Sequence, residues 1–95
     1  DTRPLPLQRL FAAEHPDSGI HLEVLSTEPA FQFYTANFCN VPAVAGASAK
    51  GQRSGFCLEP SRYVNAVNEP AWKHMVLLKK GERYGARSVY RVWKE

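Results

Sequence analysis

The chain has 95 residues, of which 44% are apolar and 12% aromatic, and its formal net charge is +3. This length suits one small domain or a piece of a larger one, and the apolar content excludes an intrinsically disordered tail. No apolar run approaches the roughly 20 residues that a membrane-spanning helix needs. The first residues, Asp-Thr-Arg-Pro, include neither an initiator Met nor the layout of a signal peptide. We therefore expect a soluble, cytoplasmic fragment of a longer protein.

Charge is divided unevenly along the chain. Residues 1–49 carry 2 basic and 5 acidic side chains, whereas residues 50–95 carry 10 and 4. The basic half suggests an anionic partner. Many of these cations lie on or beside a predicted hairpin, where exposed Lys and Arg discourage edge-to-edge pairing of strands; they are Lys79, Lys80, Arg83, Arg87 and Arg91. No basic helix or nucleic-acid motif accompanies them, so we expect neither nucleic acid nor membrane among the partners.

The cysteines and histidines do not form a metal motif. Cys39 and Cys57 match neither zinc-site spacing nor a Cys-x-x-Cys motif. A disulfide between them stays open, but two reduced, buried thiols are the more common arrangement in a chain without a secretory signal. His21 and Glu23 share one face of a predicted strand but have no third ligand. We therefore expect no metal and no cofactor.

The first half of the chain reads as strands. Residues 7–13 form a short apolar run, and residues 15–19, His-Pro-Asp-Ser-Gly, predict a turn. Residues 20–26 alternate in the period-2 pattern of a half-buried strand. Pro29 cannot donate a ladder hydrogen bond and should offset the next strand, which the aromatic residues 31–35 predict.

The second half predicts three more strands. Residues 41–53 have small side chains and no aromatic residue, which predicts a surface loop. Residues 55–59 predict a strand that ends at Pro60, and residues 60–73 predict an irregular surface segment. Residues 74–79 and 83–93 predict a closing hairpin with Gly81 at its turn. The predicted fold class is all-β with antiparallel strands, several of which would need partners that the chain does not contain.

Strand alternation also places polar groups together. It puts Cys57 and Glu59 on one face of residues 55–59, and Gln32 and Tyr34 on one face of residues 31–35. If the apolar faces pack inward, a carboxylate, an amide and a phenol point into a cleft. Carboxylates and amides bind sugar hydroxyls, and aromatic surface packs against the apolar face of a sugar ring. A single glutamate at a strand end is nevertheless more often solvated than catalytic.

Two motifs link these residues to a family. Residues 27–37, Thr-Glu-Pro-Ala-Phe-Gln-Phe-Tyr-Thr-Ala-Asn, resemble a segment of aldose 1-epimerases (galactose mutarotases) that has glycine in the places of Ala30 and Ala36. Residues 55–59, Gly-Phe-Cys-Leu-Glu, resemble the family's Gly-Phe-Cys-x-Glu, and residues 76–84 resemble its closing hairpin. The resemblance runs from about residue 18 to the end. Pro60 and Ser61 depart from the family's Thr-Gln, which leaves sugar selectivity open.

The resemblance implies a fold and an activity. It implies that residues 1–95 are the C-terminal fragment of one large galactose-mutarotase-like β-sandwich domain. It also implies that Glu59 is the catalytic base and that Gln32 binds substrate while the α and β anomers of galactose or glucose interconvert. The family's acid is an upstream histidine, and none of His15, His21 and His74 lies in a matching motif.

The chain is thus expected to supply the base but not the acid, and to need the missing N-terminal part of the same fold. The alternative is a mutarotase-like carbohydrate-binding protein without turnover.

Overall fold

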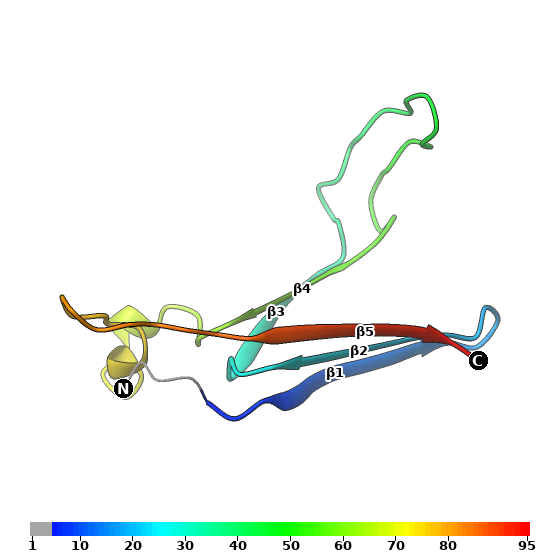
Figure 1. Cartoon of the computed structure of the whole chain (residues 1–95). Helices are drawn as coiled ribbons and strands as arrows, with labels where there is room; N and C mark the ends of the chain where they lie inside the picture. Colours follow the sequence, from blue (N-terminus) through cyan, green and yellow to red (C-terminus); the bar gives the residue numbers. More distant parts are fainter. Residues whose placement is uncertain (1–4) are drawn as a thin grey trace.

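A computed structural model describes residues 5–95 of the protein (Figure 1). Residues 1–4, with the Asp-Thr-Arg-Pro start of the predicted domain 1–95, lie outside the described residues. The described part contains five β-strands, two single turns of 3₁₀-helix and no α-helix, which confirms the all-β prediction. The elements are β1 (Gln8–His15), β2 (Ile20–Ser26), β3 (Ala30–Tyr34), β4 (Cys57–Ser61), η1 (Ala66–Asn68), η2 (Lys73–Met75) and β5 (Ser88–Lys94).

Three strands form an antiparallel sheet in the order β1-β2-β5. The predicted turn joins β1 to β2. Within it, the Ser18 hydroxyl accepts a hydrogen bond from the Ile20 amide at 3.2 Å, and Gly19 takes a φ of +72° that a side chain would disfavour. Val24 lies at the centre of the middle strand, opposite Phe11 on one side and Tyr90 on the other, and is 1% exposed. The alternation predicted for residues 20–26 therefore buries this sheet's central residue.

The strands β3 and β4 form a separate antiparallel ladder of five residue pairs. Its aromatic face packs on β1, where the ring of Phe11 lies 6.1 Å from those of Phe31 and Phe33 and 6.4 Å from that of Phe56. Figure 1 shows this ladder crossing the three-stranded sheet at an angle, with the connection 35–56 projecting beyond it. The predicted surface loop lies in that connection, where every residue from 40 to 50 is exposed.

Several strand boundaries differ from the sequence prediction, most clearly those of β3 and β4. Pro60 does not end β4 but lies inside it, opposite Phe31. A two-stranded ladder has two free edges, and proline is tolerated where its nitrogen would face away from the partner strand. The strand β3 begins at Ala30 rather than at Phe31 and ends at Tyr34. The predicted irregular segment 60–73 holds a turn of 3₁₀-helix, η1, after the end of β4.

The predicted closing hairpin is wrong. Residues 73–75 form the 3₁₀ turn η2, and the only strand after them, β5, pairs with β2. The turn chemistry is present, since Gly81 has a φ of +91° and the Glu82 amide donates to the Lys79 carbonyl at 3.0 Å. Its flanks do not pair because the apolar residues of β5 find a longer antiparallel partner in β2, with seven residue pairs.

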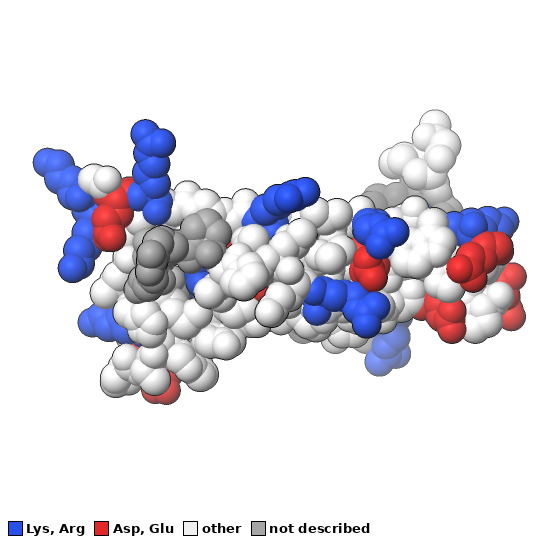
Figure 2. Space-filling model, turned by 60° about the horizontal axis from the view of Figure 1, so that its bottom comes forward, with Lys and Arg blue, Asp and Glu red and all other residues white. Residues whose placement is uncertain are grey.

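Charged side chains are spread over the surface. On the face drawn in Figure 2, Lys and Arg occur along the whole length of the molecule, with Asp and Glu among them. Of the five cations assigned to the hairpin, Arg91 lies in β5, where its Nη1 donates to Glu23 Oε1 at 2.7 Å. Within residues 5–95, no helix is long and apolar enough to cross a membrane.

The apolar core is small for a chain of this length. Its buried apolar residues among those described are Val24, Leu58 and Ala66, whereas Phe38 is 91% exposed. The Cα radius of gyration is 17.2 Å, against about 12 Å for a compact domain of this size. The two sheets therefore form an elongated molecule whose apolar faces are only partly covered.

Candidate active site

The ladder β3–β4 brings the two predicted site residues together. Gln32 and Glu59 are directly opposed in its register. Opposed residues of an antiparallel pair project to the same face, with their Cβ atoms about 4.5–5.5 Å apart. Both residues are exposed. The amide and the carboxylate are therefore neighbours, although 27 positions separate them along the chain.

The same face continues with Tyr34 and Cys57, which are opposed to each other in the ladder and lie two positions along their strands from Gln32 and Glu59. These two residues line an open pocket of about 400 Å³ at the end of the ladder. Residues of the connection 35–56 supply the other walls, including Lys50 and Ser54. The hydroxyl of Tyr34 accepts a hydrogen bond from the Phe38 amide at 3.1 Å, which ties the beginning of this connection to β3.

The opposite face of the ladder is aromatic, as strand alternation predicts. Phe31, Phe33 and Leu58 lie on it, and Leu58 is buried. The rings of Phe33 and Phe56 meet edge to face with their centroids 5.7 Å apart. Because these side chains point toward Phe11 of β1, the polar face with Gln32 and Glu59 is directed away from the three-stranded sheet.

Both cysteines are free thiols and line the same pocket. The expectation that they are buried is wrong, because Cys57 is exposed and Cys39 is half-buried. Cys57 lies on the polar face of β4, which no other described element covers, so that alternation leaves its side chain open to solvent.

The histidines lie on other elements. The ring of His21 stacks on Trp93 of β5 with centroids 5.1 Å apart, and its nitrogens approach the carboxylates of Glu14 and Glu95. His15 bonds the Ser18 hydroxyl in the turn after β1, and His74 belongs to η2. Across residues 5–95, no group of three His, Cys, Asp or Glu side chains is arranged to hold a metal ion.

A buried charge cluster near the ladder was not predicted from the sequence. The carboxylate of Glu28, just before β3, lies 3.3 Å from Nε of Arg62, just after β4, and both side chains are less than a tenth exposed. The hydroxyl of Tyr84 donates to Glu28 Oε1, and the Arg62 guanidinium lies 5.3 Å from the centre of the Tyr84 ring. The only sequence feature that could have drawn attention to this cluster is the Thr-Glu-Pro motif, to which Glu28 belongs.

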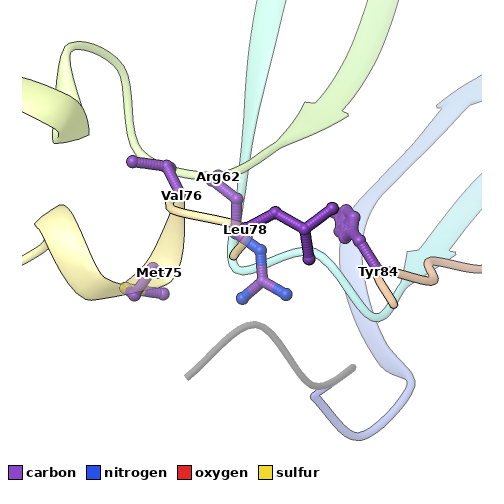
Figure 3. Close-up of a pocket in the computed structure, with 5 residues that line it drawn as sticks. All are labelled: Arg62, Met75, Val76, Leu78 and Tyr84. Carbon is purple, nitrogen blue, oxygen red and sulfur yellow. The ribbon is translucent and has the colours of Figure 1, made fainter. Parts of the chain in front are cut away.

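A pocket of about 270 Å³ lies beside this cluster. Figure 3 shows the Arg62 guanidinium between Met75 and Tyr84, with Val76 and Leu78 completing the lining. Met75, Val76 and Leu78 give this pocket mostly apolar walls. In such surroundings, opposite charges attract each other more strongly than they do in water.

Comparisons with known proteins agree with these motifs. The sequence model of the family described as "Aldose 1-epimerase" matches residues 2–91, which extends the resemblance upstream of residue 18 to include β1. The bifunctional protein GAL10 of Kluyveromyces lactis is 41% identical over 90 residues, which are 95% of this chain and 12% of the relative. The bifunctional protein GAL10 of Pachysolen tannophilus is 46% identical over 91 residues, 96% of this chain and 12% of the relative.

A shorter relative matches in the same way. The galactose mutarotase of Bos taurus is 47% identical over 72 residues, which are 74% of this chain and 20% of the relative. The chain thus spans between 12% and 20% of the length of these three proteins. Because the family model covers almost every residue from β1 to β5, this chain belongs to the aldose 1-epimerase family.

Proposed function

We propose that this chain supplies the general base and a sugar-binding amide of an aldose 1-epimerase that interconverts the α and β anomers of galactose or glucose. The observation that carries the proposal is the register of β3–β4, which sets Gln32 directly opposite Glu59. Family membership supports the assignment of these two positions, and the names of the mutarotase relatives support galactose as a substrate.

The proposed reaction moves protons and breaks one bond of the sugar. The Glu59 carboxylate removes the proton of the C1 hydroxyl while an acid protonates the ring oxygen, and the bond between C1 and that oxygen breaks. The resulting aldehyde rotates about its bond to C2, and the ring oxygen attacks its other face as the protons return. Each positioned proton-transfer group typically contributes about 10²–10⁴-fold to the rate. No electrons are transferred, so this chemistry calls for no cofactor.

Gln32 has a positioning task in this scheme. Its amide can both donate and accept hydrogen bonds, and it projects beside Glu59. A sugar hydroxyl next to the anomeric carbon can therefore bond Gln32 while the C1 hydroxyl meets the carboxylate. Fixing a substrate at two adjacent hydroxyls limits its rotation, which is how binding is converted into rate.

The proposed acid comes from outside this chain. The three histidines lie on β1, β2 and η2 rather than on the polar face of β3–β4. We therefore propose that residues 1–95 are the C-terminal part of one mutarotase-like domain, whose preceding part supplies the acid. We call that longer protein the parent polypeptide.

Substitution of the base in the parent polypeptide tests the proposal. Glu59→Gln keeps the shape of the side chain and removes the base, so kcat for the mutarotation of α-galactose, followed by polarimetry, should fall about 10²–10⁴-fold. Glu69→Gln is the matched control because its carboxylate is exposed at the end of η1. Equal rates for Glu59→Gln and the unaltered protein would contradict the assignment. Galactose binding by the unaltered protein without any mutarotation would favour the carbohydrate-binding alternative.

A further inference from the structure

We propose that Tyr84 and Tyr90 are positioning residues that hold the Glu59 carboxylate in place through two hydroxyl hydrogen bonds. This inference rests on the proposed role of Glu59 and adds to it two residues from the C-terminal segment. One hydroxyl anchors the peptide directly before Glu59. The other anchors the ion pair that closes the strand after it.

Tyr90 reaches from one sheet to the other. Its hydroxyl donates to the Leu58 carbonyl oxygen at 2.8 Å. That carbonyl belongs to the peptide group that links Leu58 to Glu59, so the hydrogen bond fixes the plane of the peptide from which the Glu59 side chain projects. Tyr90 is itself held opposite Val24, the fully buried centre of the three-stranded sheet. The best packed part of the molecule is thereby connected to the backbone of the proposed base.

Tyr84 acts at the other end of β4. Its hydroxyl donates to Glu28 Oε1, while Glu28 Oε2 lies 3.3 Å from Arg62 Nε. The terminal pair of the β3–β4 ladder is Ala30 and Ser61. Glu28 lies two residues before this pair on the β3 side, and Arg62 directly follows it on the β4 side. The buried cluster therefore joins the two chain ends that leave the ladder, two residue pairs away from Gln32 and Glu59.

The ladder needs such anchors because it is weakly held by itself. A two-stranded ladder is at best marginally stable in water, and this one has five pairs. Pro60, the residue after Glu59, has no amide hydrogen to donate. At its far end the ladder opens into the exposed connection 35–56. The two tyrosine hydroxyls bracket Glu59 along β4, and a displacement of about 1 Å at a reacting group can lower the rate about 10²-fold.

The test compares single hydroxyl deletions in the parent polypeptide. Tyr84→Phe and Tyr90→Phe should each lower kcat for galactose mutarotation about tenfold and leave KM within about threefold, because they displace the base but remove no sugar-binding group. Tyr63→Phe is the control, since Tyr63 lies beyond the end of β4 and its ring packs on Trp72 with centroids 4.8 Å apart. Rates are compared well below the lowest Tm of the set.

The same variants in a Glu59→Gln background separate positioning from a general structural defect. If the hydroxyls act through Glu59, adding Tyr84→Phe or Tyr90→Phe to Glu59→Gln lowers the residual rate no further, a strongly non-additive result. Additive losses, a kcat equal to that of Tyr63→Phe, or failure of either tyrosine variant to fold would overturn the inference. A normal kcat for Glu59→Gln alone would instead refute the proposed function.

Discussion

Ala36 occupies a backbone conformation that suits glycine. Its φ is +61°, in the left-handed region, and the resembling family segment has glycine there. The left-handed conformation costs a residue with a side chain roughly 1–2 kcal/mol. Glycine avoids this cost, but it loses more conformational entropy on folding, which offsets part of the gain. We expect Ala36→Gly to raise the free energy of unfolding of the parent polypeptide by about 0.5–1 kcal/mol, as measured by urea denaturation.

Ala30 provides the matched comparison for Ala36. It also stands where the family segment has glycine, but it lies within β3 opposite Ser61 and has no positive φ. Glycine in a strand loses entropy and packing, so Ala30→Gly should lower the free energy of unfolding by about 0.5–1 kcal/mol. Shifts of the same sign for both variants would contradict the conformational explanation.

Removing only one partner of the ion pair between Glu28 and Arg62 should lower the free energy of unfolding strongly. Both side chains are buried, and Arg62→Met leaves the carboxylate without its cation, which typically costs about 3–5 kcal/mol. Adding Glu28→Gln removes the stranded charge, and the double variant should recover part of that loss. Chemical denaturation of the four proteins measures the coupling. A double variant less stable than either single variant would show that the pair does not act as a unit.

Sequence reasoning named Glu59 and Gln32 as candidate site residues but did not predict that they lie directly opposite each other. Alternation assigns Glu59 and Gln32 each to the polar face of its strand, and the two motifs attach a family to them. The pairing register is not contained in either strand, because the long connection 35–56 leaves it free. Arg62 was missed for a different reason. It lies in a segment that reads as irregular and solvated, and only burial by residues distant in sequence shows that it is part of an ion pair.

At the element scale, local turn chemistry did not decide the strand pairing. Gly81 forms a tight turn as predicted, yet the residues before it cover the Glu28–Arg62 cluster instead of pairing with β5. The strand β5 pairs with β2 because this aligns its side chains along a sheet centred on buried Val24. Alternation and the turn residues predict individual strands and the first turn because these depend on neighbouring residues. The pairing of β2 with β5 joins residues about 68 positions apart, so no local pattern predicts it.

Substitution of the glycines in the two turns tests which turn contributes more to the stability of the fold. Gly19 has a φ of +72°, and a Cβ there would meet the Glu95 carbonyl oxygen at 2.5 Å, beside the hydrogen bond from the Glu95 amide to the Gly19 carbonyl. Gly81 has a φ of +91° but open space around it. Gly19→Ala should therefore cost about 2–3 kcal/mol of unfolding free energy and Gly81→Ala only about 1 kcal/mol. Equal costs, measured by thermal unfolding, would mean that the contact between Gly19 and Glu95 is unimportant.

The whole molecule is more elongated and less well packed than a compact domain of its length. Its extents are 47 × 32 × 23 Å, and large apolar side chains remain exposed on both sheets, including Phe33 and Val92. Monomeric proteins rarely leave extended apolar faces and free strand edges uncovered. The strands β3, β4 and β5 each carry such a face or edge, and the relatives that match this chain are about four to eight times as long.

These proportions predict how residues 1–95 behave by themselves. Few apolar side chains are buried, so the energy gained from burial is small beside the conformational entropy lost on folding. We expect the isolated chain to be expanded or aggregated in size-exclusion chromatography with X-ray scattering, and to leave mutarotation at its uncatalysed rate. The parent polypeptide, as the control, should be compact and active, since we propose that its preceding part covers the apolar faces and supplies the acid. A monomeric 95-residue chain that unfolds cooperatively and turns over galactose at the parent's rate would show that base and acid both lie within these five strands.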